Sequence, residues 1–142
     1  MKILIVDDEA TSLGLLSMIL KSYGQVETAA DGIAALQAFN LALEREPYNL
    51  IFLDIMLPKL DGQQVLKSIR RIEQERGIVG LAQTRIIMVT ALGDFANVNR
   101  AFASACTSYL TKPIRPEKVA AELAKFGIRP PAGPPADPAR RA

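Results

Sequence analysis

The 142-residue sequence contains no histidine and only one cysteine, Cys106. The absence of histidine removes the commonest general base and metal ligand, so any chemistry must use carboxylates, hydroxyls and lysines. A single cysteine cannot form an internal disulfide, and a lone thiol in an apolar neighbourhood is more often a small core residue than a nucleophile. The search for functional residues therefore starts with the acids.

Long apolar runs and a strong charge excess are also missing. The first apolar run ends at Asp7 and is too short for a signal peptide or a membrane span, so we expect a cytoplasmic protein without membrane association. The formal net charge of +2 lies within residues 129–142, which leaves residues 1–128 neutral. A basic body that binds nucleic acid is therefore not supported, and we expect no direct DNA binding.

The composition, with 49% hydrophobic and 23% charged residues, fits one globular domain with a sizeable core. Residues 128–142 differ from the rest, because they are rich in proline and alanine and contain few bulky apolar side chains. We expect a folded domain over residues 1–127 and a disordered tail over residues 128–142.

Short apolar runs alternate five times with segments of helical periodicity. Strands are expected near residues 3–6, 25–29, 49–54, 85–90 and 108–110, and helices near residues 11–23, 32–46, 62–72, 95–105 and 116–126. This alternation predicts an α/β fold in which a doubly wound, five-stranded parallel sheet is covered by five helices on its two faces.

Polar residues stand at the carboxyl ends of four of the five expected strands, where parallel sheets bind their ligands. They are Asp7 and Asp8, Asp54, Thr90 and Lys112. Three carboxylates at one edge repel each other unless a cation lies among them, and Mg²⁺ binds through carboxylates, waters and phosphate oxygens. A carboxylate flanked by Mg²⁺, a hydroxyl and a lysine is suited to attack phosphorus, with Asp54 as the nucleophile.

Four motifs contain these polar residues: Ile5-Val6-Asp7-Asp8-Glu9, Leu53-Asp54-Ile55-Met56-Leu57-Pro58 with Asp61-Gly62, Val89-Thr90-Ala91, and Tyr109-Leu110-Thr111-Lys112-Pro113. Together they resemble the motifs of response regulator receiver domains, the phosphoacceptor modules of two-component signalling. The resemblance covers residues 1–127 and implies a flavodoxin-like sheet with the strand order 2-1-3-4-5.

The resemblance also implies a role for each residue of the acidic site. Asp54 is expected to accept the phosphoryl group. Asp8 and Asp54 are expected to bind Mg²⁺ directly, together with the backbone carbonyl of Met56, while Asp7 acts mainly through water. Lys112 is expected to face the phosphoryl group.

Two further features belong to the same resemblance. Thr90 and Tyr109 resemble the switch pair, in which the hydroxyl moves towards the phosphoryl group and the aromatic ring turns inward. The peptide bond between Lys112 and Pro113 is expected to be cis.

The tail from Arg129 lacks the length and pattern of a helix-turn-helix, so we expect a stand-alone regulator with protein partners. The phosphoryl donor is expected to be a histidine kinase or a phosphotransfer protein, and the output a changed surface on the fourth helix, the fifth strand and the fifth helix. We expect an unidentified downstream protein target and either a monomer or a phosphorylation-dependent dimer.

Two other functions stay open. The chain could be a receiver-like interaction module that never takes phosphate. The presence of the acidic pair Asp7-Asp8, together with Thr90 and Lys112, argues against this interpretation. The chain could also be a phosphatase with an aspartyl nucleophile, but that chemistry ordinarily needs an acid two residues after the nucleophile, where this chain has Met56.

The phosphorylated form is predicted to lose its phosphoryl group slowly. Apolar residues, Met56 and Leu92, stand two positions after Asp54 and Thr90, where polar side chains in some receiver domains help water to attack. Apolar side chains neither orient nor admit that water. Intact-mass measurements on purified phosphoprotein with Mg²⁺ should follow the decay, and a half-life of seconds contradicts the prediction.

Overall fold

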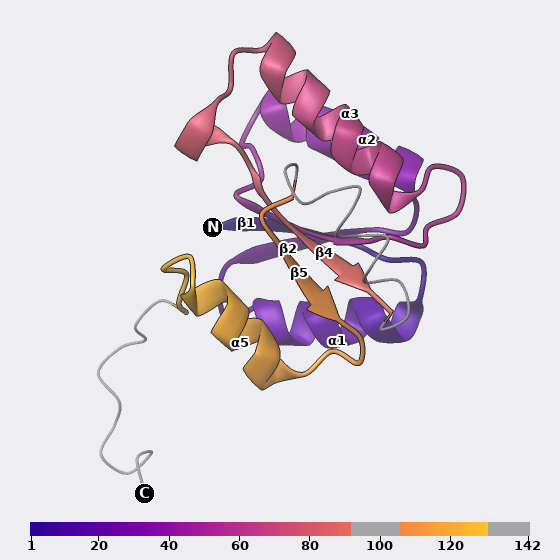
Figure 1. Cartoon of the computed structure of the whole chain (residues 1–142), viewed down its shortest axis with the longest axis vertical. Helices are drawn as coiled ribbons and strands as arrows, with labels where there is room; N and C mark the ends of the chain where they lie inside the picture. Colours follow the sequence, from indigo (N-terminus) through magenta and orange to yellow (C-terminus); the bar gives the residue numbers. More distant parts are fainter. Residues whose placement is uncertain (92–105, 131–142) are drawn as a thin grey trace, which may run out of the picture.

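The centre of the molecule is a sheet of five parallel strands in the order β2-β1-β3-β4-β5 (Figure 1). The computed structural model describes residues 1–91 and 106–130. The strands are β1 (Lys2–Val6), β2 (Gln25–Ala29), β3 (Leu50–Asp54), β4 (Arg85–Thr90) and β5 (Ser108–Thr111). The predicted doubly wound parallel sheet and its strand order are therefore confirmed.

Helices cover both faces of this sheet, with α1 (Ala10–Leu20) and α5 (Pro116–Ala124) on one face and α2 (Gly32–Leu43) and α3 (Gly62–Glu75) on the other (Figure 1). A short 3-10 helix, η1 (Gly80–Ala82), lies between α3 and β4. The helix expected at residues 95–105 lies outside the described residues. Among the described helices, none has the length and apolar character to cross a membrane.

Three helices end earlier than predicted: α2 ends at Leu43 instead of near residue 46, and α1 and α5 each end before an aromatic residue that continues the apolar periodicity. Tyr23 and Phe126 were expected inside helices, but α1 ends at Leu20 and α5 at Ala124. The chain instead turns, with the amide of Tyr23 donating to the carbonyl of Leu20 and the amide of Phe126 to that of Leu123. Both aromatic rings still pack against the core. The spacing of buried apolar residues therefore continues beyond the last helical residue of α1 and of α5.

The core consists of two apolar clusters, one on each face of the sheet. Every residue of β1 and β3 is buried, as expected for central parallel strands whose residues, apart from Lys2 and Asp54 at the ends, are all apolar. Phe39 and Leu66 belong to the cluster under α2 and α3, whereas Phe52 and Leu123 belong to the cluster under α1 and α5. Each such buried side chain contributes roughly 1.5–3 kcal/mol, and together they fix where β1 and β3 end.

A buried ion pair holds the segment between α3 and β4. Glu73 on α3 is 1% exposed, accepts a hydrogen bond from the Thr84 amide at 2.7 Å and pairs with Arg70 at 2.6 Å. Arg70 also donates to the carbonyl of Thr84 at 2.9 Å. This pairing compensates the burial of the Glu73 carboxylate and sets the entry to β4.

The turn from β3 into α3 leaves no room for a side chain at Gly62. A Cβ atom there would lie 2.3 Å from the carbonyl oxygen of Asp54 and 2.7 Å from the Cα of Ile55. The Gly62 amide donates to the carbonyl of Ile55 at 2.9 Å, and Asp61 caps α3 through a capping box with Gln64. The start of α3 is therefore pressed against the end of β3.

Replacing Gly62 with alanine is expected to destabilise the fold by about 1–3 kcal/mol, because the added methyl group collides with rigid backbone. Gly14 provides a matched control, since it lies inside α1 and a Cβ atom there meets nothing within 4 Å. Gly14→Ala should stabilise the protein by about 0.5–1 kcal/mol. Urea unfolding of both variants measures the difference, and equal effects of the two substitutions contradict the close approach.

Candidate functional site

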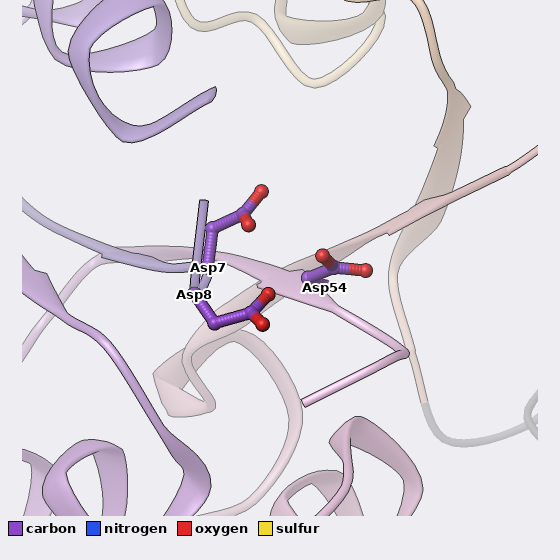
Figure 2. A group of neighbouring side chains, drawn as sticks. All are labelled: Asp7, Asp8 and Asp54. Carbon is purple, nitrogen blue, oxygen red and sulfur yellow. The ribbon is translucent and has the colours of Figure 1, made fainter. Parts of the chain in front are cut away.

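Three carboxylates meet at the carboxyl ends of β1 and β3. Asp7 and Asp8 directly follow β1, and Asp54 is the last residue of β3. The two strands are paired in register, with Val6 opposite Leu53, so their ends coincide. One oxygen of each carboxylate lies within 4.8 Å of the others, and Figure 2 shows the three side chains around a common space. The edge lies where the chain order reverses between neighbouring strands, the place at which open α/β sheets bind ligands.

Two of these acids are buried and one is exposed. Asp7 and Asp54 are 1% and 5% exposed, whereas Asp8 faces solvent. Asp7 Oδ1 accepts a hydrogen bond from the Glu9 amide at 2.9 Å, and Asp54 Oδ1 accepts one from the Met56 amide at 3.2 Å. Asp7 Oδ2 is buried without a hydrogen-bond partner among the described residues. Because buried charge without compensation is costly, this edge needs a nearby cation.

Lys112 supplies a positive charge at this edge. It follows β5, and its Nζ lies 3.1 Å from Asp54 Oδ2, 3.4 Å from Asp7 Oδ2 and 3.2 Å from Glu9 Oε1. The backbone amide of Lys112 donates to the carbonyl of Thr90 at 2.8 Å. The peptide bond to Pro113 is cis, which confirms that expectation.

The pKa values of the cluster reflect burial and charge together. Burial of the carboxylate raises the pKa of Asp54, and the negative charge of Asp7 adds to this effect, while Lys112 and the Met56 amide oppose it. Burial works in the opposite direction on Lys112, but the carboxylates of Asp54, Asp7 and Glu9 outweigh it and raise the pKa of the ammonium. Lys112 therefore remains charged at neutral pH.

The two residues predicted as a switch pair lie on adjacent strands. Thr90 ends β4 and is 1% exposed, and its hydroxyl donates to the carbonyl of Ala91 at 3.1 Å. Tyr109 on β5 is half-buried and packs against the cluster under α2 and α3. Burial, together with the neighbouring Cys106 thiol, raises the pKa of Tyr109 to about 12. Thr90 thus lies at the same edge of the sheet as the acids, but its hydroxyl is hydrogen-bonded to the backbone carbonyl of Ala91. The switch role of Thr90 and Tyr109 stays a prediction.

Cys106 is half-buried, and burial raises the pKa of its thiol. A thiol that is harder to ionise is a poorer nucleophile. This agrees with the interpretation of Cys106 as a structural residue.

The donor set of the acidic cluster suits a hard divalent cation. All three side chains offer oxygen ligands, and the exposed Asp8 leaves the cluster open to water. One buried oxygen, Asp7 Oδ2, accepts no hydrogen bond from the described residues and has only the 3.4 Å ion pair with Lys112 among them. Mg²⁺ keeps several water ligands and binds through a few carboxylates, which matches this half-open arrangement. Met56 lies in the adjacent loop and is 67% exposed, and the ligand role of its carbonyl stays a prediction. Leu92 lies outside the described residues.

Sequence reasoning assigned no role to Glu9, although this residue belongs to the first motif. In the structure its amide orients Asp7 and its carboxylate contacts Lys112. The sequence did contain a signal for a role of Glu9, because three consecutive acids, Asp7, Asp8 and Glu9, follow β1, and the expected metal site uses only two of them.

Comparison with families of known proteins gives a match to the model described as response regulator receiver domain, over residues 3–124. RpaA of Synechocystis sp., described as a DNA-binding dual master transcriptional regulator, is 39% identical over 123 residues, which are 86% of this chain and 47% of RpaA. The transcriptional regulatory protein SrrA of Staphylococcus aureus is 38% identical over 119 residues, which are 83% of this chain and 44% of SrrA. The chain thus spans less than half the length of these curated relatives.

Solved structures with the same fold include two receiver domains. A response regulator receiver domain protein from Clostridium thermocellum superposes with a TM-score of 0.73 at 26% identity, covering 87% of this chain and 91% of that chain. The BeF3-activated receiver domain of DrrB superposes with a TM-score of 0.67 at 30% identity, covering 90% of this chain and 97% of that chain.

Proposed function

The chain belongs to the response regulator receiver domain family, and from this premise we propose that it is a phosphorylation-dependent switch with Asp54 as its phosphoacceptor. Members of this family are signalling proteins and not classical enzymes. The observation that supports the proposal best is the convergence of Asp7, Asp8 and Asp54 with Lys112 at one edge of the sheet.

We further propose Asp8 and Asp54 as Mg²⁺ ligands, with Asp7 acting through water and Met56 contributing its backbone carbonyl. The support is the all-oxygen donor set and the buried Asp7 oxygen, which accepts no hydrogen bond from the part of the chain that the structure describes. Bound Mg²⁺ would neutralise charge on the phosphoryl oxygens and bring them next to the nucleophile.

The chain's own residues would carry the transfer step. A carboxylate oxygen of Asp54 attacks phosphorus, the new O–P bond forms, and the bond from phosphorus to the donor breaks, its electron pair leaving with the donor. Lys112, held 3.1 Å from Asp54, would contact a phosphoryl oxygen and compensate its charge. Thr90 would contact another of these oxygens once its hydroxyl leaves the Ala91 carbonyl.

The proposed partners are a histidine kinase or phosphotransfer protein as donor and a protein as target, and the proposed location is the cytoplasm. RpaA is described as DNA-binding, but this chain matches only 47% of the length of RpaA, so the DNA binding of RpaA is not assigned to this chain. The neutral formal charge of residues 1–128 favours a protein target for the part of the chain described here. The stand-alone organisation and the choice between monomer and phosphorylation-dependent dimer stay predictions.

Incubation with acetyl phosphate and Mg²⁺ should add the mass of one phosphoryl group to the wild-type chain but none to Asp54→Asn. Asp61→Asn is the matched control, because Asp61 lies in the same loop and caps α3 outside the carboxylate cluster. Intact-mass measurement separates the three interpretations. A stable single adduct on Asp54 supports the switch, repeated turnover of acetyl phosphate supports a phosphatase, and no adduct supports an interaction module without phosphate.

Mg²⁺ is expected to stabilise the folded protein, because it relieves repulsion among three carboxylates that exist together only in the native state. The gain should reach about 2.7 kcal/mol at a Mg²⁺ concentration one hundred times the Kd. Asp8→Asn should remove most of this gain, whereas Asp61→Asn should keep it. Thermal unfolding at several Mg²⁺ concentrations measures the effect, and a midpoint independent of Mg²⁺ contradicts the proposed metal site.

A further inference from the structure

Glu9 occupies the N-cap position of α1 without capping the helix. Its side chain makes no hydrogen bond to the first turn. On the opposite face of the sheet, α2 and α3 are capped by aspartates. Asp31 accepts a hydrogen bond from the Ala34 amide at 2.8 Å, and Asp61 accepts one from the Gln64 amide at 3.0 Å. Aspartate is among the best N-cap residues and glutamate is not, so α1 lacks a stabilising contact that α2 and α3 have.

The Glu9 carboxylate contacts Lys112 instead. Glu9 Oε1 lies 3.2 Å from Lys112 Nζ, and the Glu9 side chain is 63% exposed. The other two acids around the ammonium, Asp7 and Asp54, have side chains that are only 1% and 6% exposed. Among the described residues, Glu9 is therefore the solvent-side partner of the ammonium, and the other carboxylates that pair with it are buried.

The backbone of Glu9 takes part in the same arrangement. Its amide donates to Asp7 Oδ1 at 2.9 Å, which leaves Asp7 Oδ2 directed at the ammonium at 3.4 Å. One residue thus orients the buried acid through its backbone and contacts the lysine through its side chain.

We propose that Glu9 is a positioning residue for phosphoryl transfer, whose carboxylate holds the Lys112 ammonium at the solvent side of the Asp54 carboxylate. This inference rests on the proposed function, because the position matters for a phosphoryl group that arrives from solvent. Without Glu9, the ammonium is drawn towards Asp7 and Asp54, and Asp54 is also one of the proposed direct Mg²⁺ ligands. Lysine and metal ion would then compete for the Asp54 carboxylate.

The measurable result is weaker Mg²⁺ binding and slower phosphorylation when the contact is lost. Glu9→Gln should raise the Kd for Mg²⁺ and lower the initial rate with acetyl phosphate by about three- to fivefold each, the range expected for an exposed ion pair. The metal-free protein offers a direct readout, because the side-chain amine resonances of Lys112 in an NMR spectrum should shift in the same variant.

A general effect of negative charge is the competing explanation, and Glu9→Asp separates the two. This variant keeps the charge but is shorter by one methylene group, and aspartate at an N-cap favours the helix amides, as Asp31 and Asp61 do here. If Glu9 positions Lys112, Glu9→Asp should lose Mg²⁺ affinity and rate as Glu9→Gln does, while its thermal midpoint stays equal to or above that of the wild type. Wild-type affinity and rate in Glu9→Asp overturn the proposal.

A double-mutant cycle with Lys112→Gln tests whether Glu9 acts through the lysine. In the Lys112→Gln background, Glu9→Gln should leave the Kd for Mg²⁺ unchanged. An equal loss of affinity in both backgrounds overturns the inference, as do unchanged Lys112 resonances in Glu9→Gln. Failure of the proposed function looks different, because then wild-type protein gains no phosphoryl group while the Lys112 resonances still respond to Glu9.

Discussion

Electrostatic repulsion at one edge of the sheet is the constraint on which the functional part of this structure depends. Folding brings Asp7, Asp8 and Asp54 together and removes two of them from water, which is unfavourable without a positive charge. In the structure Lys112 provides that charge. A second cation or a phosphoryl group would therefore meet a site whose charges Lys112 already partly compensates.

The rest of the fold fixes this edge through apolar packing and backbone contacts. The fully buried strands β1 and β3 end side by side because their aliphatic residues pack on both faces of the sheet. Gly62 lets α3 begin directly against the end of β3, which holds the backbone that follows Asp54. The acids themselves contribute little to this placement, because the forces that align the strands come from the core.

Much of the fold could be predicted because it rests on apolar patterns, which are visible in a single sequence. The alternation of aliphatic runs and helical stripes gave the parallel sheet, and the strand ends gave the acidic cluster. The ends of α1 and α5 were placed too late, because Tyr23 and Phe126 continue the periodicity after the helices have ended. A pattern of this kind reports which side chains are buried, not where the backbone hydrogen bonds stop.

Polar contacts were harder to predict. The hydrogen bond from the Thr84 amide to Glu73 and the ion pair between Glu9 and Lys112 join residues of different segments, and neither of these two pairings follows a regular spacing. The resemblance to receiver domains indicated the cis bond before Pro113, but it did not reveal that the Thr90 hydroxyl bonds to the Ala91 carbonyl. These details depend on the folded geometry, where several acceptors compete for each donor.

The ion pairs of Lys112 reach across the sheet in a way that its backbone does not. In the described part of the structure, β5 pairs only with β4, yet the side chain just beyond β5 contacts acids that follow β1 and end β3. The edge strand β5 is thereby connected to the centre of the sheet by the ion pairs of Lys112 as well as by its hydrogen bonds to β4. Reciprocity requires that any partner which prefers one arrangement of this edge also changes the affinity of the acidic pocket for its ligands. A target protein bound near β5 would in this way change the affinity of the acidic pocket for its ligands, and ligands in the pocket would change the affinity for the target protein by the same factor.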